Sequence, residues 1–455
     1  MKNGKRSSFS GKLGYVLAAA GASVGLGNIW RFPYLAAKYG GGIFLIIYIV
    51  LALTFGYTMI VAETAIGRMT RKSPVGAFKS FGKKKWLSFG GWINAVIPVL
   101  IVPYYSVIGG WVIKYLVEYF RGNAKLLAED GYFTDFISNG VSTELCFVAF
   151  CAFTLIIIFA GVQNGIERVS KIMMPILIVL SVIIAVYSVT RPGAMEGVKY
   201  FLVPNVKNFS WMTVVAAMGQ MFYSLSIAMG ILITFGSYMK KETSLEDSTR
   251  NVEVFDTAIA IMAGLMIIPA VFSFSGGDPD TLQAGPALMF ITIPKVFENM
   301  GFGTVVGILF FLLVLFAAVT SSIALTESAV STFEDELGWS RRRATVLVGV
   351  IMIALGSLSS LGYGPLAGIK IIGMQFLDFF DFLTNSVMMP IAAMLTSLFV
   401  SRIVGMKRME EEIMHGESTF RRKKIFIVMI KYLCPVFALI ILISSVANAF
   451  GWIAM

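Results

Sequence analysis

Long apolar stretches cover most of this sequence and constrain its fold more than any other feature. Eleven of them reach the length of about 20 residues that a helix needs to cross a bilayer, and short polar loops separate them. The mean hydropathy of +0.80 is too high for a chain folded in water, so most of the chain must lie in lipid. The predicted spans cover residues 13–37, 41–66, 89–120, 143–160, 168–190, 210–238, 252–275, 302–333, 341–359, 371–401 and 424–452.

The basic residues are distributed unevenly between the loops. If the N-terminal tail, residues 1–12, lies in the cytoplasm, the inside segments hold 26 of the 37 lysines and arginines and the outside loops hold nine. Cytoplasmic loops carry such an excess. We therefore expect a multi-pass protein of the cell (inner) membrane with a cytoplasmic N-terminus. Because the number of spans is odd, the C-terminus is expected to be extracellular or periplasmic. The same distribution explains the net charge of +11 without a nucleic-acid partner.

Residues that commonly carry catalysis are scarce. The single histidine, His415, lies in a charged loop, which nearly excludes a histidine-based triad or a zinc site. The three cysteines lie in apolar stretches at no metal-binding spacing, and they are interpreted as small buried hydrophobic residues. We therefore expect that the protein is not an enzyme.

Two spans have centres that are poorly suited to a helix. Residues 21–28 of the first span contain three glycines, and the sixth span contains Gln220, residues 224–226 and Gly230 at mid-depth. Close helix packing would explain the glycines, but it would not explain Asn28 or Gln220 at that depth. A break in each helix explains both features. It frees carbonyls that suit a sodium ion and half-helix N-termini that suit a carboxylate.

The two breaks fall five spans apart. This is the spacing expected of two inverted five-helix halves with a binding site between them at the membrane midplane. The sequence therefore predicts an all-α integral membrane fold. Its first inverted repeat covers 13–190, its second covers 210–401, and an eleventh helix, 424–452, is added to them.

Further polar residues lie within the predicted spans. Ala317, Thr320 and Ser321 share one helical face. Their oxygens could complete a cage around a small cation, or the two hydroxyls could bond back to their own helix. Asp256 has no basic neighbour in sequence, and a buried carboxylate must find a cation or lose its charge. Glu63 is expected to accept backbone amides that a broken helix has freed.

The segment 21–34, GASVGLGNIWRFPY, resembles the first-helix signature of the neurotransmitter:sodium symporter family. Residues 320–322 and 333–337 are similar to its eighth helix and the following loop, and the resemblance extends over the whole chain. The eleven spans are similar to those of bacterial amino-acid transporters of the family. The resemblance implies the leucine-transporter fold and sodium-coupled transport of an amino acid by alternating access.

The resemblance also implies two sodium sites and a substrate pocket. Ser23, Asn28, Ser224 and Asp256 would form the first sodium site together with the substrate carboxylate. Gly21, Val24, Ala317, Thr320 and Ser321 would form the second. The implied substrate pocket consists of Ala22, Ser23, Leu26, Gly27, Ile101, Tyr105, Tyr223, Ser224, Ser226, Met229, Ser321 and Leu325.

Within that pocket, Tyr105 would donate its hydroxyl to the substrate carboxylate, and Tyr223 would cover the pocket from outside. Two charged pairs would act as gates. The extracellular gate would join Arg31 to Asp381, and the cytoplasmic gate would join Arg6 to Asp335. Phe9 stands near the second pair, where the family often has tryptophan.

Three residues bear on the choice of substrate and ion. Monoamine carriers of the family place aspartate at the position of Gly25, so glycine predicts a substrate that brings its own carboxylate. Met229 stands where the bacterial leucine transporter has phenylalanine, and its adaptable thioether leaves space for a larger side chain. Asp256 can supply the negative charge that chloride supplies in animal relatives, unless it forms a salt bridge with a loop arginine such as Arg250.

We therefore expect a chloride-independent symporter that couples two sodium ions to a hydrophobic L-amino acid, whose side chain can be aromatic. A sodium-independent amino-acid exchanger or an amino-acid sensor on the same fold are the alternatives. Membrane lipid surrounds the expected protein, and the sequence does not indicate an oligomeric state.

Overall fold

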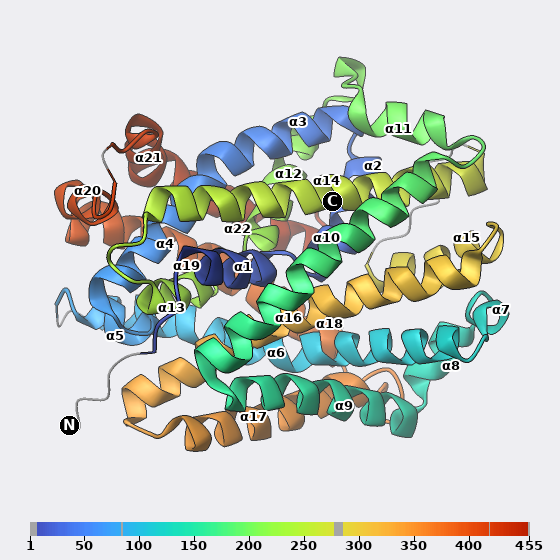
Figure 1. The fold of residues 1–455 in the computed structure, drawn as a ribbon, viewed down its shortest axis with the longest axis horizontal. Helices are drawn as coiled ribbons and strands as arrows, with labels where there is room; N and C mark the ends of the chain where they lie inside the picture. The colour runs from blue at the N-terminus through green and yellow to red at the C-terminus, as the bar shows by residue number, and fades with distance from the viewer. Residues whose placement is uncertain (1–6, 83–84, 277–284, 418, 454–455) are drawn as a thin grey trace.

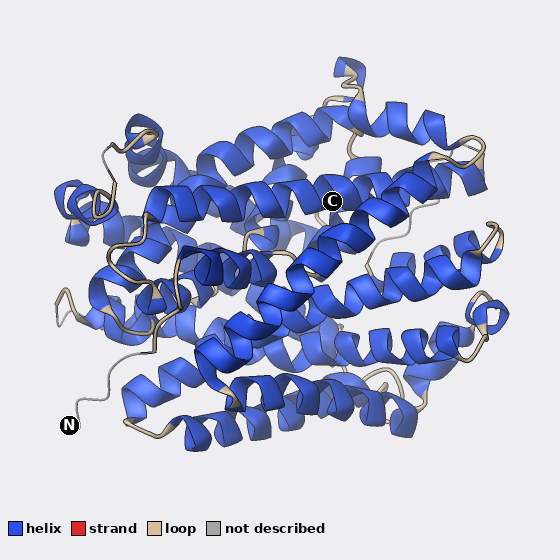
Figure 2. Cartoon of the chain, in the orientation of Figure 1, coloured by secondary structure: helices blue, strands red, loops and turns tan. Residues whose placement is uncertain are grey.

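A computed structural model describes residues 7–82, 85–276, 285–417 and 419–453. Every regular element in these ranges is a helix, as Figure 2 shows. The long helices run side by side along the horizontal axis of Figure 1, and short helices lie at both ends.

We call the end with α5 (Pro74–Lys79) and α20 (Met406–Ile413) the inner end. The opposite end, with α7 (Ala124–Leu127) and α15 (Ile293–Glu298), is the outer end. These ends lie at the left and right of Figure 1.

The described residues contain nine helices that are long and apolar enough to cross a membrane, and a tenth candidate is a pair of helices bent by 54°. They agree with ten of the eleven predicted spans, and the remaining one, 210–238, consists of two shorter helices. In chain order the spans are α1 (Lys12–Ser23) with α2 (Phe32–Lys38), α3 (Gly42–Leu51) with α4 (Tyr57–Thr70), α6 (Lys85–Phe120), α9 (Gly140–Phe159), α10 (Arg168–Val189), α12 (Trp211–Ser224) with α13 (Ile231–Tyr238), α14 (Leu245–Ser275), α16 (Gly303–Leu337), α17 (Arg341–Leu361), α18 (Phe376–Asp381) with α19 (Met389–Phe399), and α21 (Lys423–Val428) with α22 (Cys434–Ala449).

Both predicted breaks are confirmed. In the first span α1 ends at Ser23 because Val24 has an extended backbone, with φ −72° and ψ 95°, and a π-helical turn at Gly27–Arg31 leads into α2. In the sixth span, α12 and α13 are separated by a segment in which Ser226 and Ala228 have φ of 53° and 59°. Residues with side chains rarely adopt this left-handed conformation, so neighbouring groups must hold the segment in place.

Glu63 is one of these neighbouring groups. Its carboxylate accepts the N–H of Ala228 at 2.8 Å, and its side chain is fully buried. A buried amide without a partner costs free energy, so this hydrogen bond stabilises the broken segment. The role that the sequence predicted for Glu63 is confirmed.

Some predicted boundaries are wrong. The eighth span continues beyond residue 333 to Leu337, where Gly338 ends it with φ 62°, so the expected loop at 333–337 is helical. The tenth span begins at Phe376 rather than residue 371. Residues 371–374 instead form a tight turn that an isolated antiparallel bridge closes between Ile371 and Met374.

Candidate functional site

A cavity lies beside the two breaks. The first, third, sixth and eighth spans contribute its walls. All residues expected in the substrate pocket line it, namely Ala22, Ser23, Leu26, Gly27, Ile101, Tyr105, Tyr223, Ser224, Ser226, Met229, Ser321 and Leu325. Gly25, Asn28 and Ile231 line it as well. The structure therefore brings the whole predicted set together, although its members are up to about 300 positions apart.

One region of this cavity is polar and tightly packed. The N–H of Leu26 donates to the Tyr105 hydroxyl at 3.3 Å. A Cβ built on Gly25 would lie 2.7 Å from Ser321 Oγ and 3.1 Å from the Tyr105 hydroxyl. A side chain at position 25 would therefore displace the hydroxyl groups that face the cavity.

Two tyrosines separate this cavity from a larger one. Tyr105 and Tyr223 also line an outer vestibule. A Cβ built on Gly27 would lie only 2.4 Å from the Tyr223 ring, so the glycine allows this ring to rest on the first span. The Arg31 guanidinium lies 5.4 Å from the centroid of the same ring. Tyr223 is thus placed as a partition on the outer side of the cavity.

The residues of the expected extracellular gate face the outer vestibule, but they do not form an ion pair. Arg31 and Asp381 both line it. In the described part of the chain, these two side chains do not form an ion pair. Asp381 instead accepts hydrogen bonds from Asn385 at 2.6 Å and from the Tyr104 hydroxyl at 3.2 Å. The two side chains therefore line the same vestibule without a direct contact between their charges.

A buried carboxylate joins three spans beside the first break. Asp256 accepts hydrogen bonds from Asn28 Nδ2 at 2.8 Å and from Ser224 Oγ at 3.0 Å. These are three of the four residues expected at the first sodium site, and the fourth, Ser23, lines the same cavity. Tyr48 also donates to Asp256, at 3.1 Å. Sequence reasoning missed Tyr48, although a tyrosine within a span usually needs a partner for its hydroxyl.

The arginine considered as an ion-pair partner for Asp256 pairs with another carboxylate. Arg250 lies 3.5 Å from Asp247, at the inner end of α14. Within the described ranges, no basic side chain lies within ion-pair distance of Asp256. The carboxylate is fully buried, so its environment suits a bound cation.

The residues expected at the second sodium site also lie together. Ser321 Oγ lies 3.3 Å from the carbonyl oxygens of both Gly21 and Val24. The Thr320 hydroxyl bonds back to its own helix, at 3.2 Å from the Ala317 carbonyl. The alternative from the sequence therefore holds for Thr320, whereas Ser321 reaches across to the first span. The atoms that could coordinate an ion here are all oxygens, which hard cations such as sodium prefer.

The inner end is closed by an aromatic cluster around Phe9. This side chain is 1% exposed and has three rings within 6.0 Å between centroids. The three rings belong to Tyr15, Phe235 and Tyr238. Of the expected cytoplasmic gate, Arg6 lies outside the described residues. Asp335 accepts the N–H of Ser73 at 2.7 Å, just before α5.

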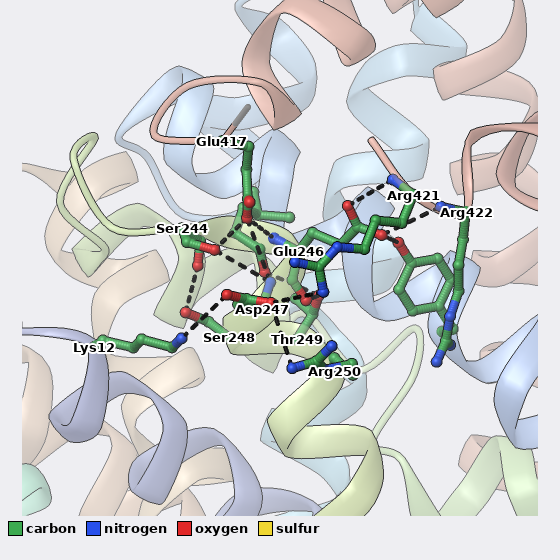
Figure 3. A network of polar contacts seen from close by, with 12 residues as sticks. Lys12, Ser244, Glu246, Asp247, Ser248, Thr249, Arg250, Glu417, Arg421 and Arg422 are labelled. Atoms are coloured by element: carbon green, nitrogen blue, oxygen red, sulfur yellow. Dashed lines mark hydrogen bonds and ion pairs between the residues drawn. The ribbon is translucent and has the colours of Figure 1, made fainter. Parts of the chain in front are cut away.

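A polar network at the inner end joins the connection between the tenth and eleventh spans to α14 (Figure 3). Glu417 accepts the N–H groups of Glu246 and Asp247 at 3.1 and 3.4 Å, which caps the first turn of α14. Glu246 in turn accepts the N–H groups of Arg421 and Arg422 at 3.0 and 3.3 Å. Each segment thus satisfies backbone groups of the other.

Two ion pairs extend this inner-end network. Lys12, the first residue of α1, lies 3.6 Å from Asp247. Arg68 of α4 pairs with Glu412 of α20 at 2.6 Å, and both side chains are buried. The network therefore connects the starts of the first and seventh spans and the end of the second span to the segment 406–422.

Comparison with known proteins finds that the sequence is similar to one family of transporters. The model of the sodium:neurotransmitter symporter family matches residues 6–129 and 134–451. The sodium-dependent transporter YhdH of Bacillus subtilis, named as uncharacterized, is 35% identical over 421 residues, which cover 92% of each chain. The human sodium- and chloride-dependent GABA transporter 2 is 26% identical over 470 residues, which cover 90% of this chain and 75% of the relative.

A solved structure also matches the fold. The crystal structure of MhsT in complex with L-phenylalanine has 36% sequence identity and a TM-score of 0.86. The match covers 97% of this chain and 100% of MhsT.

Proposed function

The chain belongs to the sodium:neurotransmitter symporter family and is a sodium-dependent transporter, and we propose that it carries a hydrophobic L-amino acid, which can be aromatic, together with two sodium ions. We further propose that it works by alternating access and does not need chloride. The observation that carries this proposal is the cavity beside two helix breaks, with an oxygen cluster on either side of it.

The walls of the cavity support an amino acid with an apolar side chain. The Leu26 N–H and the Tyr105 hydroxyl lie at its polar region, near the start of the half-helix that follows the first break, and such ends favour a carboxylate. Ile101, Met229 and Leu325 form apolar wall elsewhere. L-Phenylalanine in the related MhsT fits this division of polar and apolar surface.

The space at Gly25 supports a substrate that keeps its carboxylate. The hydroxyl groups of Ser321 and Tyr105 occupy the volume that a side chain at this position would need. An acidic side chain there, as in monoamine carriers, would exclude them. A decarboxylated amine would leave these donors without an anionic partner.

Coupling between the ions and the substrate follows from shared residues. Ser321 lines the cavity and also contacts the carbonyls of Gly21 and Val24 at the proposed second sodium site. Asn28 and Ser224 line the same cavity and contact Asp256 at the proposed first site. A ligand that orders the first break therefore raises the affinity for the other ligands that bind there. This mutual effect on affinity is the thermodynamic meaning of coupling.

Asp256 supports independence from chloride. Two sodium ions and one zwitterionic substrate bring two positive charges in excess into a site away from water. Burying such an excess is costly unless an anion lies nearby. The fully buried carboxylate of Asp256 supplies a fixed negative charge at this place.

The arrangement of the cavities supports alternating access. We propose that the inner end faces the cytoplasm and that the repeats 13–190 and 210–401, which meet at the cavity, open it to one end at a time. The outer vestibule adjoins Tyr223, whereas the Phe9 cluster fills the inner end. Closure of the vestibule would then bring Arg31 to Asp381 and complete the outer gate.

Transport by the purified protein in lipid vesicles tests this proposal. Uptake of radiolabelled L-phenylalanine should require an inward sodium gradient. Competition by all twenty amino acids should rank tryptophan, tyrosine, phenylalanine or leucine above glycine, lysine and glutamate. Equal uptake with and without a sodium gradient would instead indicate an exchanger.

A further inference from the structure

The chain between α11 (Ala194–Leu202) and α12 forms a segment that we call the outer arm, residues 202–211. All ten of its residues are exposed. Half of them are large and apolar, and the side chains of Val206 and Trp211 are 78% and 79% exposed. Figure 1 shows this green segment at the upper edge of the bundle, projecting sideways from the long helices. Exposed apolar clusters of this kind mark contact with a membrane or a partner.

The contacts of the arm place it at the level of the outer membrane boundary. A Cβ built on Gly42 would lie 2.5 Å from the carbonyl carbon of Val203, and Gly42 is the first residue of the second span. Pro204 forms an isolated antiparallel bridge with Gly41. The arm therefore lies beside the beginning of a membrane span.

The residue before the arm confirms this level. The Phe201 ring would lie 2.3 Å from a Cβ built on Gly264, so it packs on α14. Gly264 precedes the outer end of α14 at Ser275 by eleven residues, or roughly 16 Å at 1.5 Å per residue. The arm thus lies alongside the outer part of the bundle and not beyond it.

The surface next to the arm faces lipid. Ile46, Val50 and Leu53 of the second span form a stripe at helical spacing, and their side chains are 44%, 53% and 42% exposed. Such a stripe on a membrane span contacts acyl chains. The stripe begins one turn inside Gly42, and the apolar side chains of the arm continue it toward the outer end.

The backbone of the arm is suited to an apolar environment. The N–H groups of Asn208 and Phe209 donate to carbonyls within the arm, at 3.0 and 3.1 Å. The N–H of Lys207 donates to the Asn205 side chain at 3.0 Å, and that of Ser210 donates to Thr213 Oγ1 at 3.3 Å. Satisfied amides lower the cost of contact with lipid. The exposed side chain of Lys207 is long enough to reach the headgroups.

We propose that the outer arm inserts its apolar side chains into the adjacent leaflet of the bilayer, with Val206 and Trp211 among the acyl chains. Aromatic side chains favour this boundary region. The arm leads directly into α12 and contacts the chain that follows α2, so it attaches the outer halves of both broken spans to lipid. This proposal requires only that the bundle lies in a membrane, and it is independent of the transported substrate.

Site-directed spin labelling of the full chain in lipid nanodiscs tests the proposal. Val206→Cys and Trp211→Cys are made in a background whose three native cysteines are replaced, and each carries a nitroxide. Electron paramagnetic resonance then measures access of oxygen, which concentrates in lipid, and of a water-soluble nickel chelate. The spectra of both labels should be broadened strongly by oxygen and only weakly by the chelate.

Two positions serve as controls. Val50→Cys lies on the lipid-facing stripe of the second span, and Lys125→Cys lies in α7 at the exposed outer end. Labels on the arm should behave like the label at position 50. Access to the chelate as high as at position 125 would overturn the proposal and would leave the arm as a surface for a soluble partner.

Discussion

Replacing Glu63 by leucine should weaken substrate binding although Glu63 does not line the substrate cavity. The variant removes the acceptor of the Ala228 N–H, a hydrogen bond of 2.8 Å in a fully buried place. Leaving the buried Ala228 N–H without a partner costs about 1–3 kcal/mol. The left-handed conformations of Ser226 and Ala228 remain unfavourable in the variant and lose this support.

The expected magnitude follows from the population of the intact break. Ser226 and Met229 line the cavity from this segment, so only molecules with an ordered break bind substrate. For a marginally stable break, a loss of about 1–3 kcal/mol lowers that population, and raises the apparent Kd, by roughly 5-fold to 150-fold.

Equilibrium binding of L-phenylalanine to purified protein in saturating sodium measures this effect, with gel filtration as the check that the variants remain folded. Glu63→Gln is the matched control, because its amide oxygen can still accept the Ala228 N–H. It should bind within a few-fold of wild type. Wild-type affinity in Glu63→Leu would show that the hydrogen bond does not hold the break and would refute the reasoning.

Three further predictions concern the proposed sites. Thr320→Ala combined with Ser321→Ala should abolish sodium-driven uptake into vesicles, and wild-type uptake would show that the second sodium site is assigned wrongly. Gly25→Ala should weaken L-phenylalanine binding by roughly 5-fold to 150-fold, because its Cβ would lie 2.7 Å from Ser321 Oγ and overpacking of a tight site costs about 1–3 kcal/mol; unchanged affinity in a binding assay would contradict this. Wild-type uptake should be equal in gluconate and in chloride, whereas Asp256→Ser should lose uptake or become chloride-dependent, and a wild type that stops in gluconate would overturn the role of Asp256.

Much of the central site could be predicted because its residues are unusual for their depth. Glycines and amides in the middle of an apolar stretch conflict with a continuous helix, and both breaks lie where such residues occur. The role of Glu63 followed from the same reasoning, since a buried carboxylate needs donors and a broken helix offers amides.

Other contacts could not be predicted from one sequence. Tyr48 and Asp256 are 208 positions apart, and a tyrosine in an apolar stretch carries no sign of its partner. Arg68 and Glu412 are 344 positions apart, and each alone is one more charge at a span end. Arg31 and Asp381 both line the outer vestibule without forming an ion pair in the described residues, and residue type alone does not fix the distance between them.

The inner-end network has a mechanical consequence. Removing either partner of the buried Arg68–Glu412 pair would cost about 3–5 kcal/mol, because the other charge would stay buried without a partner. The Glu417 cap and the Glu246 contacts join the same segment to α14. Because these contacts join it to both spans, we expect the segment 406–422 to move together with the inner ends of the second and seventh spans in any rearrangement of the inner end. The tenth span ends at Val404, and Gly405 follows it with φ 83° before α20 begins. Gly405 is therefore the expected hinge between the tenth span and this segment.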